Sequence, residues 1–497
     1  MDYDLIILGS SPAGIEAALL AAQYRSRVAL LTLDLPIQSR TAIDQKAFFF
    51  PAAFHGKEKN LTLDGGFQIR RSRLKLITLP PLNASTRGSI LNTSILDTLA
   101  IAGIDTIDAS GYFLPGNRGF YTPKRSFPLT ARSYLLALPG IPVIPSIPGL
   151  ESIPYQIFDS ADHGLFQKND RFATDLQTDF QVSKHWLCLG ESLDSLSMAE
   201  SLIQEGNTVT LLLPKPDFFQ ERVLQRVQVY LEGLGVKIFT GVNTEQVEQV
   251  NNKIHVQTNL GAFQGDRFGL AIEQQPMPID LHLEHLHPNF KTHFDTEFNL
   301  KKPIAVNRFL QSICYPRLYV CGLSLGGTPS ETIAIYEACL AVENALYGSK
   351  RSVRYDTIAY PRLAHPLYTQ LGWTEPQAEQ YWLQSHLSIL EVSGWEDSTL
   401  NPSPNPLINP VLRVILHRNG QILGAQGLGL LAAQAIEVLA LGKQQKCSWK
   451  TLLKTMTGGS VAELLRGLRW QQAQQERADG KDLWREPFFN WKRTGFF

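Results

Sequence analysis

Nearly continuous apolar segments alternate with amphipathic ones at the start of the chain. Residues 3–8 have the pattern of a buried strand, residues 12–23 that of an amphipathic helix, and residues 27–34 that of a second strand. Continuous apolar strands are typical of parallel sheets that helices cover on both faces. The pattern therefore predicts a strand–helix–strand unit at the N-terminus.

The same unit returns about 180 residues later, in the segments "HWLCLGESLDS", "LSMAESLIQEG" and "NTVTLLLPKP". Each copy has a glycine-containing turn between its first strand and its helix, where doubly wound domains bind the pyrophosphate of a dinucleotide. The repeat therefore predicts two doubly wound α/β domains. From Tyr360 onward, "NPVLRVILHRNGQILGAQGLG" and "AAQAIEVLALG" predict antiparallel strands flanked by helices.

Composition excludes several classes of protein. The 497 residues carry a formal net charge of zero, so no overall field attracts nucleic acid. The five cysteines are scattered and none precedes Cys188, which predicts a reduced, cytoplasmic chain without a disulfide framework. The first strand begins within three residues, which leaves no room for a signal peptide. The longest apolar stretch, residues 422–442, contains Gln426, Gln434 and Glu437, which favours a buried helix over a membrane span.

The order and spacing of these features resemble those of the pyridine nucleotide–disulfide oxidoreductases over roughly residues 3–465. "GWTEPQAEQYW" and "ILGAQGLG" are similar to segments of that family's dimerisation domain. The resemblance implies an α/β fold with two nested Rossmann-like dinucleotide-binding domains, FAD-type and NAD-type, plus a C-terminal α+β dimerisation domain that forms a homodimer. The boundaries it implies are residues 1–150 and 281–350 for the FAD-type domain, 151–280 for the NAD(P)-type domain, 351–465 for the dimerisation domain and 466–497 for an aromatic, basic tail.

The positions that bind FAD in the family are altered here. Gly9 and Gly14 keep the first and third glycines of the phosphate turn, and Ser11 replaces the second. The acidic residue that contacts the adenosine ribose is replaced by Thr32, which we expect to hydrogen-bond the ribose without bringing charge. In the family's "G-D" pair Gly322 remains, but Leu323 replaces the aspartate that holds the ribityl chain. A charge-assisted hydrogen bond of that kind contributes roughly 1.5–3 kcal/mol. FAD is therefore expected to bind weakly.

The NAD-type turn departs further from the family pattern. Gly190 remains, while Ser192 and Ser195 replace the other two glycines. Two acidic residues inside the turn bring negative charge toward a helix N-terminus that should attract phosphate. After the second strand, where the family has an acidic residue, this chain has Leu213. NAD(P) binding is therefore doubtful.

The family's redox groups are absent. In the alignment that the resemblance implies, its second cysteine becomes Ala42 and the lysine four residues later is Lys46, which we expect near the cofactor. The histidine of the family's "H-P-T-x-S-E" motif becomes Gly458, while Glu463 remains. Because thiol–disulfide exchange needs a thiolate, disulfide reductase chemistry is excluded and no catalytic residue is assigned.

Three other features have both an ordinary and a functional interpretation. His282, His285 and His287 suggest a metal site, but no fourth ligand accompanies them, so a solvated loop without metal is favoured. Cys321 fits packing better than redox work. The tail "LWREPFFNWKRTGFF" fits docking on its own dimer, or contact with a protein or membrane surface.

Two functions remain open. One is a pseudoenzyme that keeps the dimeric scaffold for assembly or regulation, which the loss of both nucleotide signatures favours. The other is a flavoprotein that passes electrons from NAD(P)H through FAD to an acceptor other than a disulfide.

Overall fold

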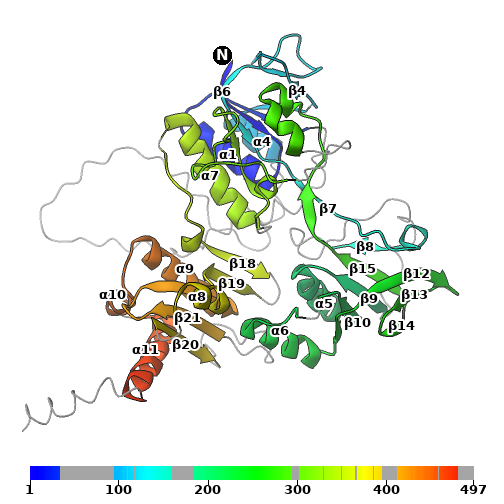
Figure 1. Ribbon diagram of the computed structural model, residues 1–497, viewed down its shortest axis with the longest axis vertical. Coiled ribbons are helices and arrows are strands. Elements are labelled where there is room, and N and C mark those ends of the chain that lie inside the picture. Colours follow the sequence, from blue (N-terminus) through cyan, green and yellow to red (C-terminus); the bar gives the residue numbers. More distant parts are fainter. Residues whose placement is uncertain are drawn as a thin grey trace, which may run out of the picture.

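The computed structural model describes residues 1–33, 95–158, 184–293, 302–393 and 411–478, apart from residues 109, 117, 216, 328–329, 349, 364–366, 384–385 and 457 inside these ranges. Lys46, Ala42 and the aromatic tail after residue 478 lie outside the described residues. Three five-stranded sheets organise the described part, and Figure 1 shows them as three separate groups of strands.

The first sheet is parallel and is built from segments far apart in the sequence. Its strand order is β17-β6-β1-β2-β3. The side chains of α1, α4 and α7 pack on one face, and the other face packs on a cluster that includes Phe113, Phe120 and Leu283. Burial on both faces explains the continuous apolar strands. The elements are β1 (Tyr3–Leu8), α1 (Pro12–Gln23), β2 (Val28–Leu31), α4 (Ile95–Ile101), β3 (Asp105–Ile107), β6 (Ala131–Leu136), β17 (Leu318–Val320) and α7 (Glu331–Tyr347).

The second sheet repeats this arrangement. Its order is β11-β10-β9-β15-β8, and β9 pairs in parallel with β10 as β1 does with β2. The internal repeat predicted from the sequence is thus confirmed. The elements are β8 (Gln156–Ile157), β9 (His185–Gly190), α5 (Asp194–Gln204), β10 (Thr208–Leu213), α6 (Arg222–Gly233), β11 (Lys237–Thr240) and β15 (Arg267–Ala271), with a meander of β12 (Thr244–Val250), β13 (Lys253–Thr258) and β14 (Gly261–Gly265).

A two-stranded ribbon joins the two parallel-sheet units. β7 (Gly140–Pro142) leaves the first unit and pairs antiparallel with β16 (Gln274–Pro276), which returns from the second. Figure 1 shows this ribbon between the units. A short hairpin of β4 (Tyr112–Phe113) and β5 (Phe120–Tyr121) covers the first sheet. One unit is therefore inserted into the other, as predicted.

The third sheet is antiparallel and is flanked by helices, as predicted for the chain after Tyr360. Its order is β18-β19-β22-β21-β20. α9 packs on it, and Trp449 of α10 and Leu465 of α11 complete the core. The elements are β18 (Ala359–Leu363), β19 (Tyr368–Gly372), α8 (Glu375–Tyr381), β20 (Leu387–Ser393), β21 (Val411–His417), β22 (Ile422–Leu428), α9 (Leu430–Gln444), α10 (Trp449–Thr455) and α11 (Ser460–Ala478).

The predicted fold class, two Rossmann-like units and a C-terminal α+β unit, is confirmed. The exact domain boundaries remain predictions, and the one drawn after residue 465 falls inside the continuous helix α11. In the part of the chain that the structure describes, no helix combines the length and the apolar composition needed to cross a bilayer.

Candidate functional site

The structure gathers most of the predicted nucleotide positions at the carboxyl edge of the first sheet. Gly9 follows β1, Thr32 follows β2 and Gly322 follows β17. Since β1 lies between β2 and β6, and β17 lies next to β6, these residues meet along one edge. Crevices at the carboxyl ends of parallel strands are where doubly wound folds bind ligands.

The two retained glycines allow the first turn to form. Gly9 has φ of 108°, and a Cβ there would lie 2.3 Å from the carbonyl oxygen of Ala137. A Cβ on Gly14 would lie 2.4 Å from the carbonyl oxygen of Gly9. No larger residue fits either position without moving the backbone. The close approach of helix and strand that a dinucleotide turn needs is therefore present.

Ser11 is the N-cap of α1. Its hydroxyl accepts a hydrogen bond from the backbone N–H of Gly14 at 3.2 Å. Such a cap stabilises a helix by about 1 kcal/mol. A pyrophosphate at this N-terminus would compete with the serine for that N–H group.

The hydroxyl of Thr32 is bound to a neighbouring carboxylate. The side chain is 1% exposed, and its hydroxyl donates to Asp108 Oδ1 at 2.6 Å. Because a carboxylate already accepts its proton, this hydroxyl could contact a ribose only as an acceptor, and the ribose contact remains a prediction. Asp108 follows β3, the neighbour of β2, and its other oxygen lies 3.8 Å from Lys124 Nζ. Sequence analysis missed Asp108, although its place after a neighbouring parallel strand is the signal that points to this edge.

Gly322 binds a buried carboxylate. Its N–H donates to Glu337 Oε2 at 2.7 Å, and the hydroxyl of Tyr355 donates to Glu337 Oε1 at 2.6 Å. Burial raises the pKa of Glu337, while these two hydrogen bonds act in the opposite direction. Burial and the neighbouring carboxylate of Glu337 raise the pKa of Tyr355. Gly322, which begins this turn, is thus held in place by hydrogen bonds within the protein.

Leu323 closes the adjacent position. A Cβ on Gly140 would lie 2.8 Å from Leu323 Cδ1 and 2.3 Å from Gln274 Oε1. The leucine therefore packs directly against β7, where the chain crosses between the two units. An apolar contact lies where the family resemblance implies an aspartate that holds a flavin ribityl chain, so this position does not fit that group.

The second turn is filled by its own side chains. Ser195 is fully buried, and a Cβ on Gly190 would lie 2.1 Å from the Ser195 Cβ and 3.2 Å from Leu213 Cδ2. The hydroxyl of Ser195 donates to the carbonyl oxygen of Ser192 at 2.7 Å. Asp194 adds a carboxylate to the first turn of α5. Steric filling and negative charge both oppose a nucleotide phosphate here.

The cysteines offer no redox pair. All five lie in the described part of the chain and none is in a disulfide. Cys188 and Cys321 are buried, and burial raises the pKa of both thiols. Burial also raises the pKa of Cys339, to about 11. Because exchange requires the thiolate, these three thiols are poorly suited to it, and the packing interpretation of Cys321 fits its position.

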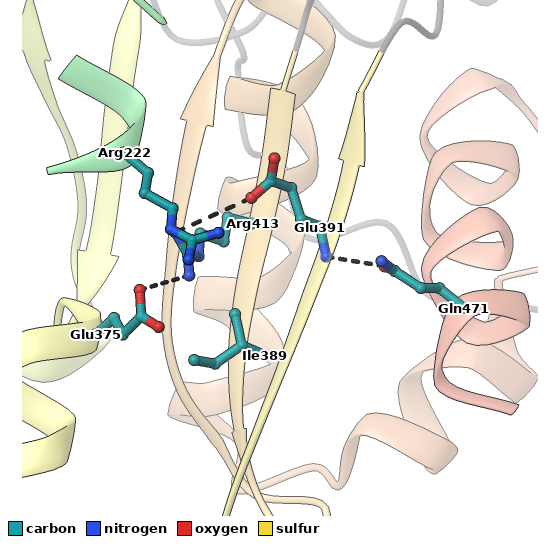
Figure 2. A pocket seen from close by; sticks show the side chains of 6 residues that line it. All are labelled: Arg222, Glu375, Ile389, Glu391, Arg413 and Gln471. Carbon is teal, nitrogen blue, oxygen red and sulfur yellow. Dashed lines mark hydrogen bonds and ion pairs between the residues drawn. The ribbon is translucent and has the colours of Figure 1, made fainter. Parts of the chain in front are cut away.

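An open pocket of about 470 Å³ lies away from both turns, between α6 and the third sheet. Figure 2 shows Arg413 between Glu375 and Glu391. Arg413 Nη2 lies 2.5 Å from Glu375 Oε2, and Nη1 lies 4.0 Å from Glu391 Oε2. The N–H of Glu391 donates to Gln471 Oε1 at 2.9 Å. These lining groups bind one another, so the pocket is not the candidate site.

Known proteins resemble this chain over most of its length. A mercuric reductase of Staphylococcus aureus is 22% identical over 458 residues, covering 89% of this chain and 77% of that protein. A glutathione reductase of Nostoc sp. is 23% identical over 464 residues, covering 88% of this chain and 93% of that protein.

Solved structures share the fold. The HOCl-induced flavoprotein disulfide reductase RclA from Escherichia coli matches with a TM-score of 0.64 and 18% identity, covering 94% of this chain and 99% of that one. LpdA from Mycobacterium tuberculosis matches with a TM-score of 0.67 and 17% identity, covering 93% and 99%. The family described as pyridine nucleotide-disulphide oxidoreductase matches residues 3–322. The chain belongs to this family.

Proposed function

We propose that the protein is a member of this family without disulfide reductase activity that serves as a dimeric scaffold or regulator. The observation that carries the proposal is the filled second turn, where Ser195 occupies the space beside Gly190. Without bound NAD(P)H, a reductase of this family has no electron donor. The replacement of the family's cysteine by Ala42 and of its histidine by Gly458 removes the remaining chemistry.

A second candidate function is a flavoprotein reductase that acts on an acceptor other than a disulfide. The N-terminus of α1 is compatible with it, because backbone amides at a helix N-terminus attract a pyrophosphate. Asp108 favours it as well, since its side chain is 63% exposed beside Thr32, at the edge where the family resemblance implies an acidic ribose contact. When bound, FAD would supply redox chemistry that no side chain offers. Leu323 weakens this candidate.

The assembly we propose is a homodimer through residues 351–465, located in the cytoplasm, with no role in nucleic-acid binding. The family resemblance of "GWTEPQAEQYW" and "ILGAQGLG" supports the dimer. Thr374 is the N-cap of α8 inside the first of these segments and forms a capping box with Gln377. The tail after residue 478 is proposed to dock on this dimer, or to contact a protein or membrane surface.

Two measurements on the purified full chain test the proposal. The first is the visible absorption spectrum, followed by mass analysis of any small molecule that denaturation releases. The second is titration with NADH and with NADPH, followed by nucleotide fluorescence. We expect no flavin bands and no saturable NAD(P)H binding tighter than about 1 mM, a free energy of only about 4 kcal/mol.

Asp108→Asn separates the two candidate functions. It keeps an oxygen that can accept from Thr32 and removes only the negative charge. If FAD binds and this variant binds it about tenfold more weakly, the flavoprotein candidate is supported, and steady NAD(P)H oxidation by the wild type would overturn the scaffold proposal. Lipoamide, glutathione and mercuric ion should give no turnover in either protein.

A further inference from the structure

A cluster of metal-ligand side chains lies outside both nucleotide turns. It follows β16, in the segment "PIDLHLEHLHP", which contains the short 3₁₀ helix η4 (Leu283–His285). One ligand atom from each of His282, Glu284 and His285 lies within 4.8 Å of the others. We propose that these three residues bind a transition-metal dication of the Zn²⁺ or Cu²⁺ class.

The backbone holds the cluster in place. Leu281 and Leu283 are buried in the core of the first unit, at 3% and 2% exposure. His282, which lies between them, and Glu284, which follows them, remain partly exposed. The carbonyl oxygen of Leu281 accepts from the N–H of Phe113 in β4 at 2.9 Å. His282 has φ of 47°, a left-handed conformation that is uncommon outside glycine. The segment is therefore anchored on both sides of a sharp local bend.

His285 is oriented by a main-chain acceptor. Its Nδ1 lies 2.7 Å from the carbonyl oxygen of Phe113. A carbonyl can only accept, so Nδ1 carries the hydrogen and the neutral ring keeps its lone pair on Nε2. Metal-binding histidines almost always donate their other ring N–H in this way, to a carbonyl or a carboxylate.

The ring of His282 is oriented by carboxylates, as the ring of His285 is by a carbonyl. Its Nδ1 lies 3.2 Å from Asp280 Oδ1 and 3.0 Å from Glu284 Oε1. Asp280 also accepts from the His282 backbone N–H at 3.0 Å, so it remains in place as an orienting group if Glu284 turns to a metal. The ring of Tyr112 contacts the His282 ring edge-on, and the two imidazoles stack with centroids 4.9 Å apart. Both rings are thus fixed before any ligand arrives.

The donor set selects the class of metal. Two imidazole nitrogens and one carboxylate oxygen suit Zn²⁺ and Cu²⁺, whereas Ca²⁺ and Mg²⁺ prefer oxygen ligands throughout. Three protein ligands with water in the fourth position form a complete zinc site. The lack of a fourth protein ligand, which favoured a metal-free loop from sequence, therefore does not exclude binding. The third ligand in the structure is Glu284, whereas sequence analysis considered His287 for that role.

The structure suggests matched variants for the test. His282→Asn preserves tolerance of the left-handed backbone, His285→Gln keeps a donor for the Phe113 carbonyl, and Glu284→Gln removes only the charge. His287→Gln is the control, because that histidine lies in the same segment but outside the group. Melting temperatures without metal should show that all four variants fold.

Zn²⁺ is titrated into the chelator-treated full chain in competition with a colorimetric indicator, and Co²⁺ absorption reports the ligand type. We expect one Zn²⁺ per chain, at least about 100-fold weaker binding in His282→Asn and His285→Gln, and about 10-fold weaker binding in Glu284→Gln. The control should match the wild type within about twofold. Binding that survives both histidine variants, a thiolate charge-transfer band, or no binding tighter than about 100 μM (about 5.5 kcal/mol) would overturn the proposal. None of these outcomes depends on whether FAD or NAD(P) binds.

Discussion

Leu323 is the position at which the two candidate functions predict opposite results. Its half-buried side chain packs against β7, one residue after a glycine whose N–H already binds the buried Glu337. Leu323→Asp restores the family's aspartate at that point. If the chain accepts FAD, the new carboxylate gains the ribityl hydroxyls as partners. If the site is closed, the carboxylate packs against β7 without such partners.

The magnitudes follow from these contacts. Losing a half-buried leucine costs about 0.75–1.5 kcal/mol, half of the value for full burial. Placing a poorly paired carboxylate there adds about 1–3 kcal/mol. The sum of about 2–4.5 kcal/mol corresponds to a melting temperature lower by about 4–18 °C, given about 2–4 °C per kcal/mol for units of this size. Restored ribityl contacts would instead raise FAD affinity about tenfold, or 1.4 kcal/mol.

The assay follows melting temperature during FAD titration of the wild type, Leu323→Asp and Leu323→Asn. The asparagine variant removes the same packing and places no charge there, so its difference from the aspartate variant isolates the charge. We expect the aspartate variant to melt lowest and FAD to leave all three curves unchanged. If FAD restored the aspartate variant selectively, the site would be open and the scaffold proposal would be wrong.

Three further predictions concern stability and assembly. Burial raises the pKa of Glu337 above its ordinary value of 4.5, so its contribution to stability is fully present below about pH 4.5 and is lost as pH rises through the folded-state pKa. Glu337→Gln should therefore flatten that part of the profile of melting temperature against pH. An unchanged slope would contradict this account. Arg362 Nη1 lies 2.7 Å from Glu221 Oε1 between the second and third units, so Arg362→Met should lower the free energy of unfolding by about 3 kcal/mol. Arg226→Ala, which breaks an exposed 3.5 Å pair with Glu391, should cost under about 1 kcal/mol, and equal losses would refute the distinction. Sedimentation at micromolar concentration should show a dimer, and a monomer would contradict the interface proposed for residues 351–465.

The architecture was predictable because it depends on local patterns. Continuous apolar strands specify parallel sheets, and the repeated strand–turn–helix order specifies two doubly wound units. The third sheet was predictable for the same reason, since alternation and turn residues are short-range signals. None of these inferences requires knowing which distant residues touch.

The side-chain partners at the candidate site were not predictable in this way. Thr32 and Asp108 are separated by 76 positions and meet only because β2 and β3 are neighbours. Gly322 and Glu337 meet because α7 returns along the strand that precedes it. The histidine segment was not predictable for the same reason. The sequence shows three closely spaced histidines and gives no means of choosing Glu284 over His287 as the third ligand. Each choice depends on backbone geometry that spacing alone does not encode.

The two turns also show which positions can report on function. The glycines of the first turn are required by backbone contacts, Gly9 against the carbonyl of Ala137 and Gly14 against the carbonyl of Gly9. These contacts exist whether or not a nucleotide binds, so the retention of the glycines follows from packing alone. In the second turn, Gly190 is required by the side chain of Ser195, which itself takes up space beside the strand. Retained glycines therefore do not discriminate between a flavoprotein and a scaffold. Positions without such a packing requirement do, and in this chain the informative ones are Leu323 and Asp108.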